Sequence, residues 1–364
     1  MFYLPASSLI AGQCELLCKS EWMKDATYAQ ILERVVLYGE NVDGTGSKSF
    51  FDPDPPLFVA ASSNNLVAVS ALLELGADVN VTGYNGWTPV FAAENFEIAK
   101  TLINADADLN RRNKFGWVPL HIIDNEEVWF LLKNSGANIR LRNEVGVTTI
   151  MTAQSLNIFE FLLAEGLDPL EVALDQSNAL FYNTSDEVIV KLIDLGLDVN
   201  AVNNDGATPL HNNPNAGSLF ALINAGANIY ALNEKRETPL EVSWHRAGVL
   251  DVYCKTDPAI FEKQNVNGDL LLHLALKSYA SSTAHINKII LCTKDLEITN
   301  SVGQTALHVA AGGFSAEYVQ LLLDAGADAK ATDINGMTPF DISRKNLLFN
   351  DEEIVWKLNE ARFN

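Results

Sequence analysis

One pattern recurs along the sequence with a spacing of 30 to 35 residues. Its clearest copy lies between Gly303 and Gly336, where a glycine turn precedes the apolar run Thr305–Ala311 and a second apolar stretch, Tyr318–Leu323, that ends in Ala-Gly-Ala. Thr305 can cap the first stretch as a helix, and Gly326 can adopt the left-handed conformation that ends the second. Each copy therefore predicts two helices joined by a turn, followed by a hairpin.

Alignment of the copies gives ten positions for the turn residue, and seven of them are glycine. A fixed period of this length is typical of a solenoid, in which each unit buries its apolar side against its neighbours. In order, the turn residues are Pro53, Gly86, Gly116, Gly146, Gln176, Gly206, Arg236, Gly268, Gly303 and Gly336.

Two motifs within this pattern resemble those of the ankyrin repeat family. The first opens the first helix and is seen at Thr88-Pro89, Thr208–His211, Thr238–Leu240, Thr305–His308 and Thr338-Pro339. The second closes the second helix and is seen at Leu75–Asn80, Ser135–Asn138, Leu195–Asn200, Ala225–Asn228 and Ala325–Asp328. The resemblance implies an all-α ankyrin-repeat solenoid of about ten helix-turn-helix units with hairpin loops, over residues 51–345.

Five successive units, between Gly86 and Arg236, are only 30 residues long. Val118 and Gly136 are 18 residues apart, whereas their counterparts Thr305 and Gly326 are 21 apart, so the missing residues lie within the helix pair. We expect one fewer helical turn or a tighter corner there, and a changed stacking angle.

The two ends of the chain do not follow the repeat. In residues 1–50 the sequence predicts two helices, Glu15–Lys24 and Thr27–Tyr38, and a loop. In residues 346–364 it predicts a helix with one apolar face and one polar face. We expect an N-terminal helical cap over 1–50 and a C-terminal capping helix over 346–364, because a terminal repeat otherwise exposes an apolar face. The alternative for residues 1–50 is a separate recognition element.

A formal net charge of −21 argues against direct nucleic-acid binding, because phosphate contacts would form against a repulsive field. It favours a basic partner, or simply solubility. The start of the sequence lacks the basic region of a signal peptide, and we expect no membrane-spanning segment and a cytoplasmic location.

The four cysteines are Cys14, Cys18, Cys254 and Cys292. Cys14 and Cys18 lie one helical turn apart and could hold a metal, but no other ligands follow at zinc spacing. We therefore expect no metal, buried free thiols and a reducing compartment.

Four of the six histidines share one repeat position, and the family resemblance implies that each ring bonds the backbone of the next loop. They are His121, His211, His273 and His308. Their spacing along the stack prevents them from converging on one substrate. The sequence contains no phosphate-binding loop, dinucleotide-binding motif or hydrolase elbow, so we expect no enzyme activity and no cofactor.

A single hairpin position carries asparagine in most units, where a side-chain oxygen can accept from an amide two residues on and hold the turn. The residues are Asn113, Asn143, Asn203, Asn233, Asn265 and Asn300, with Asp333 as the last.

Three other asparagines, Asn80, Asn110 and Asn200, follow a leucine by eight residues and an aspartate by two. This spacing is similar to the pattern in ankyrin repeats that an oxygen-dependent dioxygenase hydroxylates, and it predicts hydroxylation at these three residues. The same residues are also simply the repeat consensus.

Side chains on the hairpin tips and on the exposed faces of the first helices are not needed for packing between units, so we expect partner contacts there. Tyr84, Trp87, Phe115 and Trp117 stand out, because aromatic side chains are enriched at interface hot spots. The alternative is that the rings pack neighbouring hairpins together.

A local excess of basic residues lies between Arg111 and Arg142, with six basic side chains against three acidic ones. Arg112, Arg140 and Arg142 suit a carboxylate or phosphate, which arginine can bind in a bidentate manner. The alternative is that these arginines neutralise the protein's own acidic helices.

These patterns together predict a non-enzymatic protein–protein interaction module, an adaptor or inhibitor, whose protein partner carries an acidic or phosphorylated segment. Divergent short repeats also resemble those of ankyrin proteins that intracellular bacteria or viruses deploy in a host cytoplasm. The alternative function is an acidic decoy or immunity-type inhibitor that neutralises a basic protein or mimics nucleic acid. The predicted partner-binding residues are Tyr84, Trp87, Arg112, Phe115, Trp117, Arg140 and Arg142.

Overall fold

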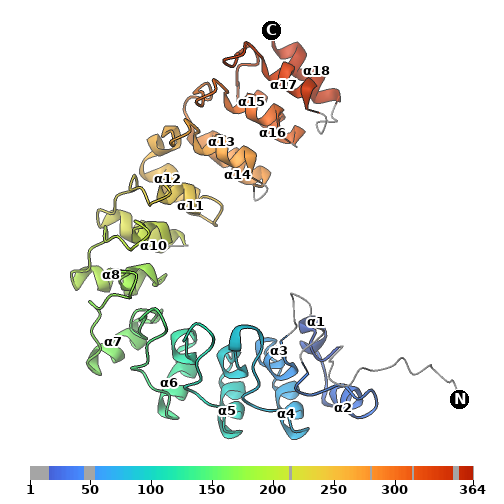
Figure 1. Cartoon of the computed structure of the whole chain (residues 1–364), viewed down its shortest axis with the longest axis vertical. Helices are drawn as coiled ribbons and strands as arrows, with labels where there is room; N and C mark the ends of the chain where they lie inside the picture. Colours follow the sequence, from blue (N-terminus) through green and yellow to red (C-terminus); the bar gives the residue numbers. More distant parts are fainter. Residues whose placement is uncertain are drawn as a thin grey trace, which may run out of the picture. The chain divides into compact units, whose positions relative to one another are not determined.

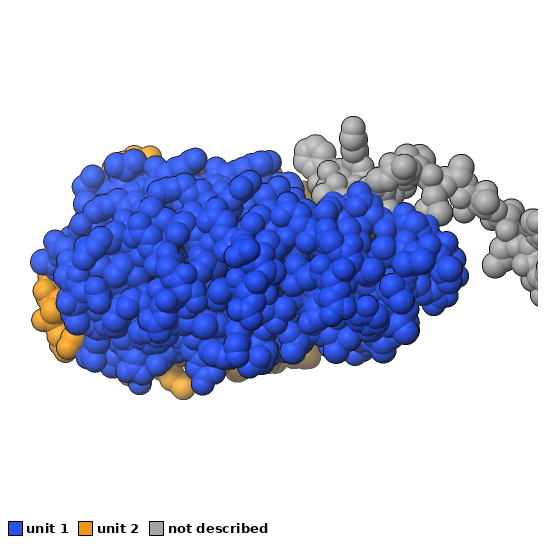
Figure 2. Space-filling model, turned by 90° about the horizontal axis from the view of Figure 1, so that it is seen from below, with its two compact units in different colours: residues 1–188 blue, residues 189–364 orange. Residues whose placement is uncertain are grey.

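The computed structural model describes residues 16–44, 54–212, 215–278, 281–313, 315–346 and 352–363. Cys14, the predicted turn residue Pro53 and parts of both predicted caps lie outside these residues. The chain divides into two compact units, Met1–Val188 and Ile189–Asn364, which Figure 2 colours separately.

Both units are built from helices, and successive helix pairs within a unit lie side by side (Figure 1). The helices of unit 1 are α1 (Ser20–Met23), α2 (Tyr28–Val36), α3 (Pro56–Ser62), α4 (Leu66–Glu74), α5 (Phe96–Asn104), α6 (Glu126–Asn134) and α7 (Leu156–Ala164). Unit 1 also has four 3-10 turns, η1 (Tyr84–Gly86), η2 (Pro89–Ala92), η3 (Pro119–His121) and η4 (Ala179–Phe181).

Unit 2 continues with α8 (Asp186–Asp194), which spans the boundary. Its other helices are α9 (Pro209–Asn212), α10 (Ala216–Asn224), α11 (Pro239–Ser243), α12 (Val249–Thr256), α13 (Leu271–Lys277), α14 (Thr283–Cys292), α15 (Ala306–Ala311), α16 (Ala316–Asp324), α17 (Pro339–Lys345) and α18 (Glu352–Ala361), with the 3-10 turn η5 (Pro258–Glu262). Among the described residues, the only β-pairing is an isolated bridge between Arg142 and Thr148.

The turn positions predicted from the sequence are confirmed. All nine that fall within the described residues have a positive φ, between 61° and 84°. Glycine adopts this conformation without steric cost, whereas Gln176 and Arg236 adopt it with a Cβ. The predicted left-handed cap at Gly326 is also present, with a φ of 89°.

The residues missing from the short units come from the first helix. The second helices α5, α6, α7, α8 and α10 keep nine residues each, as α16 does. The first helix is reduced to a single turn in η2, η3, η4 and α9, against six residues in α15 and seven in α13. The predicted shortening of the helix pair therefore falls on its first member.

The core of unit 1 follows the helical spacing of the second helices. Each buries two neighbouring apolar residues and a third one turn later, such as Val128, Trp129 and Leu132 in α6. The Trp129 indole N–H also donates to the Leu120 carbonyl over 3.1 Å. This bond ties the second helix to the shortened first helix of the same unit.

The four repeated histidines have the structural role that the family resemblance implied. In His121, Nδ1 accepts from the Val118 amide at 3.2 Å, and Nε2 lies 3.1 Å from the Leu141 carbonyl in the next hairpin. Nε2 of the other three rings likewise lies 3.0 to 3.1 Å from the next hairpin's carbonyl, at Glu237, Gln304 and Met337. Each ring therefore joins two neighbouring units in its neutral form, with one nitrogen accepting and the other donating.

All but one of the hairpin asparagines act as predicted; the Asn233 oxygen accepts from the amide four residues on, at Glu237, without a described bond from the amide two residues on. The Asn113 side-chain oxygen accepts from the amides of Phe115 and Trp117, at 2.9 and 3.0 Å. Asn143, Asn203, Asn265, Asn300 and Asp333 make the same pair of bonds, to the amides two and four residues on.

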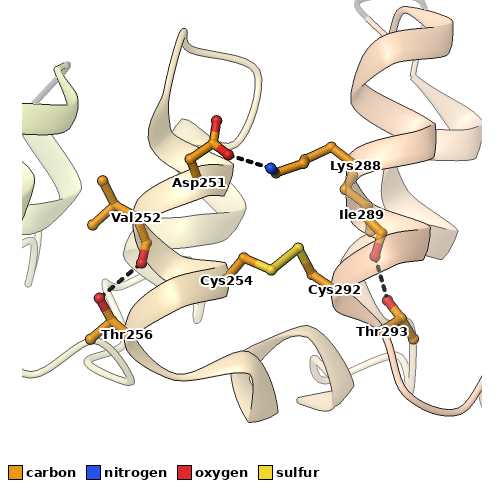
Figure 3. Close-up of a disulfide and its surroundings, with 8 residues drawn as sticks. All are labelled: Asp251, Val252, Cys254, Thr256, Lys288, Ile289, Cys292 and Thr293. Carbon is orange, nitrogen blue, oxygen red and sulfur yellow. Dashed lines mark hydrogen bonds and ion pairs between the residues drawn. A yellow bond between two sulfur atoms is a disulfide. The ribbon is translucent and has the colours of Figure 1, made fainter.

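The expectation of free thiols was wrong. Cys254 on α12 and Cys292 on α14 form a disulfide between the second helices of neighbouring units, with their Cα atoms 5.6 Å apart (Figure 3). An ion pair between Asp251 and Lys288 joins the same two helices. Cys18 is disulfide-bonded as well. The inference of a reducing compartment rested on free thiols and loses its basis.

The buried histidines make stability depend on pH. Burial lowers the pKa of His121 to about 4 and also lowers the pKa values of the other three. Because these values lie below the unfolded value of about 6.5, the unfolded chain binds protons more readily, so stability is lost as the pH falls from 6.5 towards 4. For His121 alone we expect a loss of about 3 kcal/mol, measured by chemical denaturation at both ends of this range.

The test variant is His121→Gln. It should reduce the pH dependence, because it removes the buried ring whose pKa is lowered. Equal pH dependence in wild type and His121→Gln would show that the ring does not act as described.

The disulfide between α12 and α14 should stabilise unit 2. It closes a loop across a sequence separation of 38 residues, and restricting the unfolded chain over that length corresponds to about 4 kcal/mol. We expect the double variant Cys254→Ser/Cys292→Ser to unfold at lower denaturant concentration than the oxidised wild type. Measuring the double variant with and without reductant separates the contribution of the Cys18 disulfide. An unchanged midpoint in the double variant would contradict the assignment.

Candidate functional site

The hairpins of unit 1 form one continuous edge, because backbone hydrogen bonds join each tip to the next. The amide of Lys114 donates to the Asn85 carbonyl over 2.8 Å, and the amide of Glu144 to the Phe115 carbonyl over 3.2 Å. The next bond runs from the Leu174 amide to the Val145 carbonyl, at 2.8 Å. Side chains on these four tips are therefore held in a fixed order.

Each of the four tips displays one exposed apolar side chain. We call this set the hairpin-tip row: Tyr84, Phe115, Val145 and Leu174, which are 64%, 50%, 48% and 72% exposed. The sequence singled out Tyr84 and Phe115 but not the two aliphatic members. Leu174 was missed because its unit is the weakest match to the repeat, yet its place two residues before Gln176 corresponds to that of Tyr84 before Gly86.

The two predicted tryptophans are half-buried and face their own units. The Trp87 ring packs edge-on against Phe91, with centroids 4.9 Å apart, and Trp117 packs in the same way against His121 at 5.5 Å. Among the described aromatic contacts none joins Trp87 to Trp117. Part of each ring reaches solvent, so their contact with a partner stays a prediction.

The three predicted arginines each bond a neighbouring unit. Arg112 donates from Nη1 to the Arg142 carbonyl over 2.5 Å, and Arg140 donates from Nη2 to the Glu165 carbonyl over 2.6 Å. Arg142 forms an ion pair with Glu171 at 2.6 Å. These guanidinium groups already stabilise the stack, and their role in binding stays a prediction.

Arg140 and Arg142 also line a small cavity of about 130 Å³. Asp168 and Glu171 line the same cavity, so acidic side chains of this protein share it with the arginines. Lys114 and Arg111, by contrast, are exposed and make no side-chain hydrogen bond or ion pair within the described part of the chain. They are the basic groups nearest in sequence to the Phe115 tip that remain for an external acidic group.

The three asparagines predicted as hydroxylation sites connect neighbouring units. The Asn80 side chain donates to the Asp106 carbonyl at 3.3 Å and accepts from the Asp108 amide at 2.7 Å. Asn110 and Asn200 make the equivalent two bonds. These contacts give the residues a structural role, and hydroxylation stays a prediction.

The described residues hold no ligand set for a metal centre. They contain no group of three or more His, Cys, Asp or Glu side chains that could hold a metal ion. Within the same residues, no helix has the length and apolar character needed to cross a membrane.

Comparison with known proteins bears on the family. The family model described as ankyrin repeats (3 copies) matches residues 23–113 and 272–364, which together are about half of the chain. The stretch between the two matches contains the shortened first helices η3, η4 and α9, whereas η2 lies within the first match. No curated protein matches the sequence. Ankyrin repeats are generally protein–protein interaction modules and typically not enzymes. The family match agrees with the two sequence motifs and with the stacked helix pairs. This chain therefore belongs to the ankyrin repeat family.

Proposed function

We propose that this protein is a non-enzymatic adaptor or inhibitor that binds a protein partner along the hairpin-tip row of unit 1. The observation that carries the proposal is the exposure of an apolar side chain on each of four consecutive tips. Single exposed apolar residues are common on proteins, so the proposal depends on their occurrence on four consecutive tips that backbone bonds hold in order.

The backbone bonds between tips support this function energetically. Because the tips are already fixed to one another, little conformational entropy is lost when a partner orders them. Tyr84 and Phe115 offer the large aromatic area that dominates interface energies, and Val145 and Leu174 extend the apolar surface. Arg111 and Lys114 lie beside the aromatic tips in the sequence and suit a carboxylate or phosphate on the partner.

Tyr84 and Phe115 are better test positions than the tryptophans, whose rings pack against their own units. We expect the double variant Tyr84→Ser/Phe115→Ser to lower partner affinity by at least about tenfold while the circular dichroism of the helices stays unchanged. A photo-crosslinking amino acid at position 115 would capture the partner at the proposed surface in the native cell.

Leu291 on α14 provides the matched control, because it is apolar and 73% exposed but lies outside the row. Leu291→Ser should leave affinity unchanged, and a crosslinker at 291 should not capture the same protein. If the Tyr84/Phe115 double variant bound the captured partner as well as wild type, the hairpin-tip row would not be the interface.

Salt dependence separates this function from the acidic decoy. Raising the salt concentration from about 0.1 M to about 1 M shortens the screening length from about 10 Å to about 3 Å. An interface anchored by apolar side chains should lose less than about tenfold in affinity over this range, measured by calorimetry with the captured partner. A loss of several orders of magnitude would instead support a decoy that acts through the net charge of −21.

A further inference from the structure

Within unit 2, the contact between neighbouring hairpins is interrupted after Arg236. At every described junction inside a unit that follows a glycine turn, an amide of the next hairpin donates to the preceding tip's carbonyl. In unit 2 these bonds run from Glu234 to Asp205, from Ser301 to Asn267 and from Ile334 to Val302, at 2.9, 3.2 and 3.3 Å. The equivalent bond after Arg236 would run from Val266 to Lys235, and the described residues do not make it.

The side chain at position 236 explains the interruption. A Cβ built on Gly268 or Gly303 would lie 2.6 or 2.8 Å from the amide nitrogen of the next hairpin, closer than real Cβ atoms approach. Arg236 has the same left-handed backbone, with a φ of 61°, and it carries a Cβ. If the hairpins closed after Arg236 as they do after Gly268 and Gly303, this Cβ would meet the Val266 amide, which favours the open arrangement.

The opening is a cavity of about 200 Å³. Its apolar lining includes Leu240, Ile260 and Leu271, each at most 2% exposed. Pockets for drug-sized ligands and cofactors usually measure about 300 to 1,000 Å³, so this one suits a single aliphatic side chain.

The rim of the cavity is basic. Arg236 and Lys263 both line it and are exposed, and neither forms an ion pair within the described part of the chain. Glu241 also lines the cavity, but its Oε2 accepts from the Thr238 amide and hydroxyl, at 2.6 and 2.9 Å. Two cations are thus left to meet a carboxylate from outside.

The interrupted junction also leaves backbone groups unpaired. The Val266 amide donates no hydrogen bond, and the Lys235 carbonyl accepts none, within the described residues. An extended peptide can satisfy an unpaired amide and carbonyl through its own backbone, as in strand addition to a sheet edge.

We propose that this cavity binds an extended segment of a partner protein in which an aliphatic residue lies next to an aspartate or glutamate. The aliphatic side chain enters the cavity, and the carboxylate meets Arg236 and Lys263. The peptide backbone bonds the Val266 amide and the Lys235 carbonyl. This site lies in unit 2 and stands independently of the hairpin-tip row in unit 1.

The test uses the full chain and a dye-labelled heptapeptide, acetylated and amidated, with Leu-Glu at its centre. Fluorescence anisotropy should show saturable binding. Replacing the peptide's leucine with glycine, or its glutamate with lysine, should weaken binding at least about tenfold, because each change removes one of the two recognised groups. No saturable binding of the Leu-Glu peptide would overturn the proposal.

Two variants of Arg236 distinguish the contribution of its charge from that of the cavity. Arg236→Ala keeps the Cβ and the cavity but removes a cation, and should weaken binding by about tenfold. Arg236→Gly allows the hairpins to close, so it should abolish binding and slow hydrogen exchange of the Val266 amide. Lys255→Ala, which removes an exposed cation of α12 outside the cavity lining, should change neither measurement. If Arg236→Gly bound the peptide as wild type does, the cavity would not be the site.

Discussion

Close contact between neighbouring hairpins is the constraint on which the rest of this structure depends. The contact needs a turn residue with a positive φ and, at Gly116, Gly268 and Gly303, no Cβ, so that the next hairpin's amide can reach a carbonyl. A buried histidine such as His308 adds a second bond to the same hairpin. Since these bonds involve backbone groups, units of divergent sequence can stack in the same way, and the tip side chains are released from packing.

Much of this arrangement could be predicted from the sequence, because the repeat places equivalent residues in equivalent surroundings. The turn positions and most of the hairpin asparagine bonds follow from the repeat position, and the histidine bonds follow from the resemblance to the ankyrin repeat family. Other features depend on the identity of a neighbour in space. Arg142 forms an ion pair with Glu171, a residue of the next unit. The repeat pattern does not determine which side chain occupies that position of the next unit.

Two further features lay beyond the sequence pattern for different reasons. The disulfide joins Cys254 to Cys292 across positions that no motif marks, so only the packing of α12 against α14 reveals it. The tryptophans at 87 and 117 sit one residue after a turn, where the chain leaves the exposed tip for the buried first helix. At that position a ring can point towards solvent or pack against its own unit. In the structure both rings are half-buried and pack against their own units.

The disulfide has a mechanical consequence for the chain. Under tension applied to the two ends, residues between Cys254 and Cys292 carry no load while the bond is intact, because the covalent path runs through the two sulfurs. A segment spanning 38 residues would extend to about 130 Å if released. An unfoldase that pulls the chain through a pore would therefore meet a closed loop. Its pore must admit two chain segments side by side, or the disulfide must first be reduced.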